Sequence, residues 1–184
     1  MSFATLRTPR LLLRQWRAED RAPFATMNAD PLVMEFFPAI LTRTESDAMA
    51  DRIEESIETR SFGLWAVEIP GVAPFAGFIG LTVPAYEAHF TPCVEIGWRL
   101  SSEFWNHGYA TEGATAALSY GFTTLGLKEI VAITVPANQR SRRVMEKLGM
   151  SSDEADDFDH PRFPEGHKWR RHSLYRANHA SRLS

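Results

Sequence analysis

The chain contains one cysteine, no long apolar run and no excess of charge of either sign. Because Cys93 is the only thiol, an intrachain disulfide is excluded and a reducing, cytoplasmic location is expected. No apolar run approaches the ~18 residues of a membrane-spanning helix, and Arg7, Arg10 and Arg14 interrupt the apolar residues where a signal peptide would need an unbroken run. The formal net charge of −3 gives no global basic field, so neither nucleic acid nor membrane is an expected partner.

The composition is that of an ordered globular protein, with 44% hydrophobic and 23% charged residues. No repeat or linker divides the chain, so residues 1–184 are expected to form one domain. Hydrophobic periodicity and the positions of proline and glycine predict its elements. The expected strands are 10–16, 62–69, 75–83, 93–100, 130–135 and 172–176, and the expected helices are 19–28, one capped by Thr44, 109–125 and 138–148. Early hairpins followed by a strand–helix–strand crossover favour a mixed α/β fold.

Residues 95–112 carry the strongest functional signal. They predict a strand that runs into a short loop, which opens directly into a helix. The first turn of a helix has unpaired N–H groups and a partial positive charge, which favour a bound anion. Gly108 would allow a phosphate to approach the backbone, Ala110 is small, and Thr111 adds a hydroxyl. The alternative is that Gly108 only makes a turn. Neither a P-loop nor a Gly-x-Gly-x-x-Gly motif is present.

The sequence at 105–110, Trp-Asn-His-Gly-Tyr-Ala, resembles motif A of the GNAT acetyltransferase superfamily, Gln/Arg-x-x-Gly-x-Gly/Ala. Tryptophan in the first position is typical of the branch that includes the RimJ and RimL ribosomal-protein acetyltransferases. Segments 8–14, 138–150 and 171–176 resemble other parts of that branch in the same order. The likeness spans roughly residues 5–178, so chance agreement explains it poorly.

The resemblance implies a single GNAT-like α/β domain, with a mixed, mostly antiparallel sheet of about six to seven strands and about four helices. It also implies an N-acetyltransferase with acetyl-CoA as cosubstrate. Trp98, Arg99 and Leu100 would bind the pantetheine arm through main-chain groups. Asn138 and Ser141, three apart on one helix face, would contact the pantetheine amide and the thioester sulfur. The pyrophosphate would be held by Asn106, His107, Gly108, Tyr109, Ala110 and Thr111.

Glu95 and Ser141 are the candidate catalytic residues. Glu95 would act as general base, because a carboxylate whose pKa is raised by burial suits the deprotonation of an amine. An equally weighted alternative is a surface glutamate paired across the sheet. Ser141 would be the acid or the hydrogen-bond donor to the thiolate, since Met145 stands where many superfamily members have a tyrosine and Thr134 where some have an acidic residue. Cys93 as an acyl-carrying nucleophile is a minor alternative.

The acceptor is left open between a protein N-terminal α-amine and a small-molecule amine, and an apolar sheet edge would allow a homodimer. The rival from another class is a non-catalytic acyl-CoA-binding regulator on the same fold. The acidic and histidine-containing tail, 153–172, lacks tight ligand spacing, so no metal site is expected; a solvated loop or an acidic rim that attracts a cationic amine are the alternatives. Some aromatic side chains are candidates for the acceptor pocket wall or for the core: Trp16, Phe36, Phe37, Tyr86 and Phe90.

Overall fold

The computed structural model describes residues 3–179, and a nine-stranded sheet is its central layer. The strand order is β1-β2-β3-β4-β5-β6-β9-β7, with β8 paired to β9. The sheet has more strands than the expected six to seven because β1, β7 and β8 are two residues each, too short to show a periodicity in the sequence. The strands are β1 (Leu6–Arg7), β2 (Leu12–Arg14), β3 (Leu64–Ile69), β4 (Ala73–Thr82), β5 (Glu95–Leu100), β6 (Glu129–Thr134), β7 (Ser151–Ser152), β8 (Phe158–Asp159) and β9 (Arg171–Asn178).

Four α-helices flank the sheet, as expected. They are α1 (Arg21–Ala29), α2 (Arg43–Arg60), α3 (Tyr109–Thr123) and α4 (Gln139–Lys147). The prediction that Thr44 caps the second helix was wrong. Thr42 is the N-cap, because its Oγ1 accepts from the Glu45 N–H at 3.3 Å while the Glu45 carboxylate accepts from the Thr42 N–H at 2.8 Å. No helix in the described part of the chain is both long and apolar enough to span a membrane.

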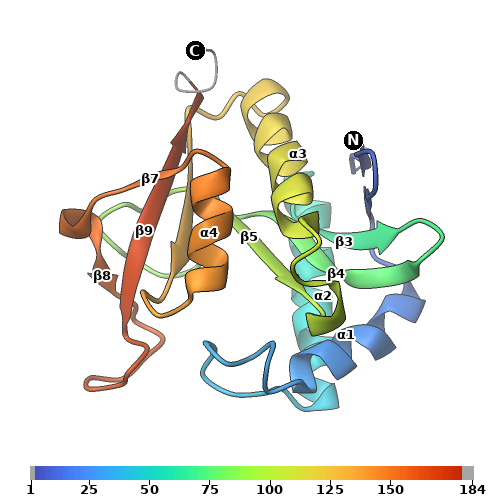
Figure 1. Cartoon of the computed structure of the whole chain (residues 1–184), viewed down its shortest axis with the longest axis horizontal. Coiled ribbons are helices and arrows are strands. Elements are labelled where there is room, and N and C mark those ends of the chain that lie inside the picture. The colour runs from blue at the N-terminus through green and yellow to red at the C-terminus, as the bar shows by residue number, and fades with distance from the viewer. Residues whose placement is uncertain (1–2, 180–184) are drawn as a thin grey trace.

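The two faces of the sheet bury separate cores (Figure 1). Side chains alternate along β3, so Trp65 and Val67 belong to the core that α3 and α4 cover, while Ala66 belongs to the core under α1 and α2. Phe78 of β4 also lies in the second core. A side chain on a central strand therefore faces one pair of helices or the other.

The functional geometry comes from the separation of β5 and β6. Nearly every strand pair is antiparallel, including the β3–β4 hairpin, but β5 and β6 are parallel and share one register pair, Glu95 with Val131. Beyond Glu95 the two strands part, with α3 and α4 on either side of the opening (Figure 1). Beyond Glu95 the edge of β5 that faces this opening is not paired with β6, which leaves main-chain groups there for a ligand; the Leu100 carbonyl is an exception, because it accepts from the Trp105 Nε1 at 2.8 Å.

Candidate active site

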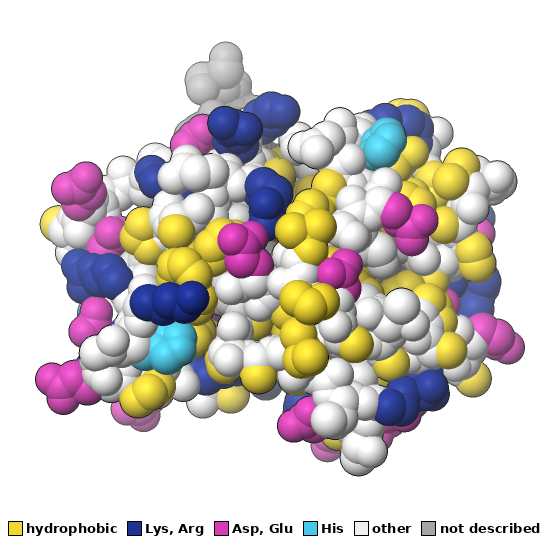
Figure 2. Space-filling view, turned by 60° about the horizontal axis from the view of Figure 1, so that its bottom comes forward, with side chains coloured by type: hydrophobic (Ala, Val, Ile, Leu, Met, Phe, Trp, Pro, Cys, Tyr) yellow, Lys and Arg dark blue, Asp and Glu magenta, His cyan; other side chains and the backbone are white. Residues whose placement is uncertain are grey.

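A cavity of about 300 Å³ lies where β5 leaves β6, between the start of α3, the start of α4 and the loop that joins α1 to α2. Figure 2 shows hydrophobic side chains gathered toward the middle of the face turned to the viewer. Ten of the eleven predicted cofactor-binding residues line the cavity; His107 does not, and its side chain is exposed. The predicted residues that line it are Trp98, Arg99, Leu100, Asn106, Gly108, Tyr109, Ala110, Thr111, Asn138 and Ser141.

The N-terminus of α3 offers a row of free amides to this cavity. Within the described chain, the main-chain N–H groups of residues 106–111 donate no hydrogen bond to protein; the first helical bond runs from Glu112 to the Gly108 carbonyl at 3.0 Å. Gly108 caps the helix with φ +82°, and Asn106 adopts φ +63°. Positive φ favours glycine and tolerates asparagine, which explains both residues at a tight turn. Consecutive free amides at a helix N-terminus are suited to hold a pyrophosphate.

Arg10 and Glu112 brace this turn, a contact that sequence reasoning missed. The Arg10 Nη1 donates to the His107 carbonyl at 2.9 Å, and its Nε donates to Glu112 at 2.6 Å. Burial by itself would raise the pKa of the Glu112 carboxyl, but hydrogen bonds from Thr8 and Arg10 outweigh it and lower the pKa. Glu112 is therefore an anion whose hydrogen bonds go to Thr8 and Arg10. The neighbouring amides are left for a ligand.

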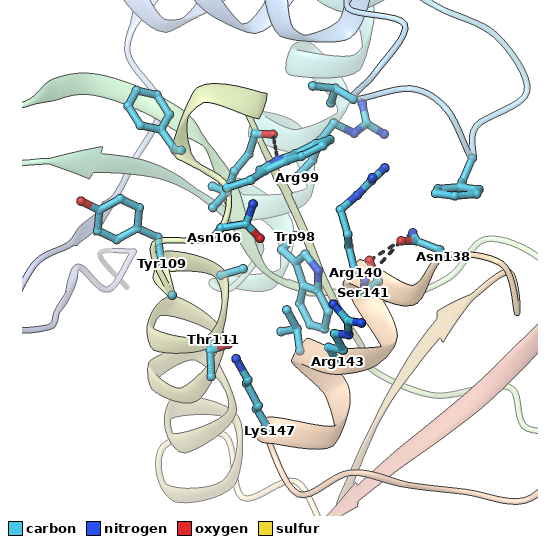
Figure 3. Close-up of a pocket in the computed structure, with 18 of the residues that line it drawn as sticks. Trp98, Arg99, Asn106, Tyr109, Thr111, Asn138, Arg140, Ser141, Arg143 and Lys147 are labelled. Atoms are coloured by element: carbon cyan, nitrogen blue, oxygen red, sulfur yellow. Dashed lines mark hydrogen bonds between the residues drawn. The ribbon is translucent and has the colours of Figure 1, made fainter.

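Asn138 and Ser141 meet at the start of α4 (Figure 3). Asn138 is the N-cap: its Oδ1 accepts from the Ser141 N–H, and its Nδ2 donates to the Ser141 Oγ, both at 3.2 Å. Because the Ser141 oxygen accepts this bond, its hydroxyl hydrogen is free to donate into the cavity.

Three cations of α4 also line the cavity and were not predicted: Arg140, Arg143 and Lys147. The i, i+3, i+7 spacing places them on one helix face, and Figure 3 shows them projecting from α4 around Trp98 and toward Thr111. Arg140 pairs with Glu35 at 2.6 Å, whereas neither Arg143 nor Lys147 forms an ion pair with a carboxylate in the described part. These two cations are suited to bind phosphate groups. Their spacing in the sequence was the signal that could have revealed them.

Glu95 lies at the point where β5 and β6 part. It is only partly accessible and forms no ion pair with the described residues. Burial raises the pKa of its carboxyl to about 7, against smaller lowering effects of the Arg162 charge and the Tyr86 hydroxyl. The Tyr86 hydroxyl is buried and close enough to Glu95 to affect its pKa, but the two do not reach full hydrogen-bond geometry. A carboxyl that titrates near neutral pH is suited to serve as a general base.

The other candidate groups do not compete for this role. Burial, with Glu95 and Glu129 adding to it, raises the pKa of the half-buried Cys93 thiol to about 11, so the nucleophilic thiolate is scarce at neutral pH. Met145 is a buried core residue, 2% exposed. No group of three or more possible metal ligands occurs in residues 3–179.

The aromatic candidates divide between the core and the site. Trp16 is core: it packs on Phe24 and Phe75, and its Nε1 donates to the Leu64 carbonyl at 2.8 Å. Phe36 and Phe37 line the cavity.

Tyr86 and Phe90 instead belong to an aromatic cluster around Phe158 and His160, beyond the cavity and beside Glu95. The nearby acidic tail is largely paired. Asp156 binds Arg176 at 2.9 Å, and Asp159 binds Arg170 at 3.1 Å.

This fold with this cavity defines the class of acyl-coenzyme A acyltransferases. Residues 10–151 match the acetyltransferase (GNAT) domain family, and the chain belongs to that family. The N-acetyltransferase YnaD of Bacillus subtilis, itself uncharacterized, is 31% identical over 162 residues, which cover 88% of this chain and 89% of YnaD. The GNAT-family acetyltransferase of Bacillus anthracis superposes with a TM-score of 0.78 at 27% identity, covering 95% and 98% of the two chains.

The RimJ and RimL resemblance is confirmed at the level of the fold. RimJ of Mycobacterium smegmatis, solved in complex with CoA-disulfide, has a TM-score of 0.73 at 20% identity over 97% of this chain and 87% of RimJ. The expected single α/β architecture, the enzyme class and the cosubstrate are confirmed: the protein is an acetyl-CoA-dependent N-acetyltransferase. The residue assignments within the cavity stay predictions.

Proposed function

We propose that the enzyme transfers an acetyl group directly from acetyl-CoA to a primary amine, with both substrates bound at once. The free amides of residues 106–111, beside the opening between β5 and β6, are the observation that carries this proposal. They would hold the pyrophosphate, with Arg143 and Lys147 nearby. The unpaired edge of β5 at Trp98 and Arg99 would hold the pantetheine arm, and Asn138 its amide.

The acceptor amine would approach from the side of the α1–α2 loop. Glu95, acting through a water, would remove a proton from the ammonium form, because its pKa of about 7 keeps a large share of the carboxylate ionised at neutral pH. The neutral nitrogen then bonds to the acetyl carbon, the thioester C–S bond breaks, and the sulfur leaves as a thiolate. The nitrogen gives up its second proton to solvent or to the thiolate, which leaves the neutral amide. Ser141 donates a hydrogen bond to that sulfur. The acceptor is a protein N-terminal α-amine or a small-molecule amine.

Titration calorimetry with acetyl-CoA, with NAD and ATP as controls, tests the cosubstrate site. We expect selective binding of acetyl-CoA by the wild type. Gly108→Glu should lose this binding, because it would place a carboxylate among the free amides of residues 106–111. Amines are then screened by release of free thiol. The Glu95→Gln variant should bind acetyl-CoA as the wild type does and turn over at least about 100-fold more slowly. Normal binding by Gly108→Glu would refute this site, and normal turnover by Glu95→Gln would refute the base.

A further inference from the structure

Arg99 is a buried cation that has no carboxylate partner among residues 3–179. Arg99 is 9% exposed and lines the cavity. No acidic side chain of the described chain lies within ion-pair distance of its guanidinium. Its Nη1 donates to the Asn28 Oδ1 at 2.6 Å, and its guanidinium carbon lies 4.0 Å from the centre of the Phe37 ring. Burial, with the Arg162 charge adding to it, lowers the pKa of Arg99 to about 10, so it is still a cation at neutral pH. A buried charge left without a counter-ion is costly and calls for an explanation.

The Arg99 guanidinium is held so that one edge has no hydrogen-bond partner in the described chain. Asn28 is fully buried and donates from its Nδ2 to the Ser46 Oγ at 2.9 Å, which fixes its oxygen toward Arg99. This bond and a longer one to the Met49 Sδ at 3.9 Å occupy Nη1. The Arg99 Nε is buried with no partner, and Nη2 makes no hydrogen bond to a described residue. The Nε–Nη2 edge is one of the two that bind a carboxylate through parallel hydrogen bonds.

Strand geometry puts this free edge on the acceptor side. Side chains alternate along β5, so Glu95, Gly97 and Arg99 share one face and Trp98 takes the other, which Figure 3 shows between α3 and α4. A Cβ built on Gly97 would meet no atom within 4 Å, so the space between the other two side chains is open. With a rise of about 3.3 Å per residue, the Glu95 and Arg99 Cα atoms lie about 13 Å apart, with Gly97 midway.

A second cation, Arg162, acts electrostatically on both Glu95 and Arg99. The Arg162 side chain is exposed and forms no ion pair within the described chain. Its charge lowers the pKa of both Glu95 and Arg99, so it adds positive potential on the acceptor side. Two cations that both act on this side of β5, neither with a carboxylate partner among residues 3–179, favour an anionic acceptor over a polyamine.

We propose that Arg99 recognises the acceptor by binding a carboxylate that the amine substrate carries. The substrate class is an anionic amine, such as an amino acid or a peptide with an acidic group near its amine. The substrate would span the open space at Gly97, its amine toward Glu95 and its carboxylate on the free edge of Arg99. This inference rests on the proposed function and narrows its acceptor.

A matched panel of acceptors tests the inference. Glycine, β-alanine, γ-aminobutyrate, aspartate and glutamate are each compared with their carboxamides, and spermidine serves as a cationic control. Free-thiol release gives kcat and KM for each compound. We expect the carboxylates to have the higher kcat/KM. Wild-type enzyme that uses the carboxamides or spermidine as well as the acids would overturn the proposal.

Arg99→Met, Arg99→Lys and the control Arg142→Met separate recognition from structure. Arg142 lies on α4 but binds the Tyr175 hydroxyl and does not line the cavity. Arg99→Met should raise KM for the carboxylates by about 10- to 100-fold, the loss expected for a charged hydrogen-bond pair, so the ratio of kcat/KM between each acid and its carboxamide should fall toward one. Arg99→Lys should restore part of the difference. Equal losses for acids and amides, or a fall in melting temperature of several degrees, would mark Arg99 as structural.

If no amine in the panel is acetylated, the inference is tested by the binding of N-acetylated products to the CoA-loaded protein. N-acetylglutamate and its diamide, and the N-acetylglycine pair, are titrated against wild type and Arg99→Met. A preference for the acid that Arg99→Met removes would support the proposal, and equal or absent binding of acid and amide would overturn it. Failure of the wild type to bind acetyl-CoA would count against the proposed function instead.

Discussion

Arg10 and Glu112 stand 102 residues apart in the sequence and form an ion pair at 2.6 Å that joins the start of the chain to the first turn of α3. Glu112 also accepts from the Thr8 hydroxyl and the Arg10 N–H. The N-terminal segment thus fixes the turn whose free amides face the cavity. An anion-binding turn gains affinity when it is held in place before the ligand arrives.

Replacing Glu112 by alanine should therefore weaken acetyl-CoA binding about 10-fold or more, although Glu112 is not among the residues that line the cavity. The Thr8 hydroxyl and the Arg10 N–H and guanidinium lose their acceptor, and the turn loses its brace. Calorimetry measures the effect. The control is Asp47→Ala, which removes the exposed Arg43–Asp47 ion pair of α2. An unchanged affinity in Glu112→Ala would show that the turn keeps its shape without the brace.

The pKa of Glu95 predicts how activity depends on pH. At saturating acetyl-CoA, kcat/KM for the acceptor should rise with pH through a midpoint near 7, as the Glu95 carboxyl loses its proton. Tyr86→Phe removes a hydroxyl that lowers this pKa, so the midpoint should move to higher pH. A midpoint that stays fixed in Tyr86→Phe, or that persists in Glu95→Gln, would assign the titration to another group.

The same pKa predicts an effect on stability. Its folded value of about 7 lies above the ordinary 4.5, so between these values the folded state binds more protons than the unfolded chain. The free energy of unfolding therefore loses a contribution from Glu95 as pH rises through this window. Glu95→Gln should melt at the same or a higher temperature than wild type above pH 7, with Glu58→Gln, an exposed position on α2, as control. A marked fall in the melting temperature would contradict the buried, raised-pKa carboxyl.

The sequence predicted the parts of the site that depend on local backbone. Gly108 stands where the loop of a strand–loop–helix pattern meets the helix, and its φ of +82° accounts for the residue type. The strand–helix–strand order also predicted a crossover, and the two strands it joins, β5 and β6, are parallel. These features are local, and local patterns are what a sequence displays most directly.

The parts that were missed depend on distant contacts. Arg10 was not predicted, and Arg99 was predicted only for its main-chain groups. What distinguishes their side chains is Glu112 beside Arg10 and, among residues 3–179, the absence of a carboxylate within ion-pair distance of Arg99. Asn28, read only as the end of a helix, is fully buried and orients Arg99. Tertiary packing decides each of these roles, and no periodicity signals it.

The cations of α4 predict a salt-dependent contribution to binding. Arg143→Gln with Lys147→Gln should weaken acetyl-CoA binding about 10-fold at low salt and reduce its salt dependence, because both side chains line the cavity without an ion-pair partner in the described chain. The control is Arg142→Gln on the same helix, since Arg142 binds Tyr175 instead. An equal loss of acetyl-CoA affinity in the control would mean that the net charge of α4, rather than these two positions, contributes to binding.

The free amides of residues 106–111 predict different outcomes for two glycines that share a backbone conformation. Gly108 and Gly126 have φ of +82° and +67°, so alanine at either position should cost about 1–2 kcal/mol of stability through left-handed strain. Only Gly108 lies at the cavity. Gly108→Ala should therefore also weaken acetyl-CoA binding, by about 10-fold or more, while Gly126→Ala binds as the wild type does. Thermal melts of the two variants measure the loss of stability through backbone strain, and calorimetry measures the loss of acetyl-CoA binding. If both bind acetyl-CoA with wild-type affinity, Gly108 makes only a turn and the free amides beside it do not hold the pyrophosphate.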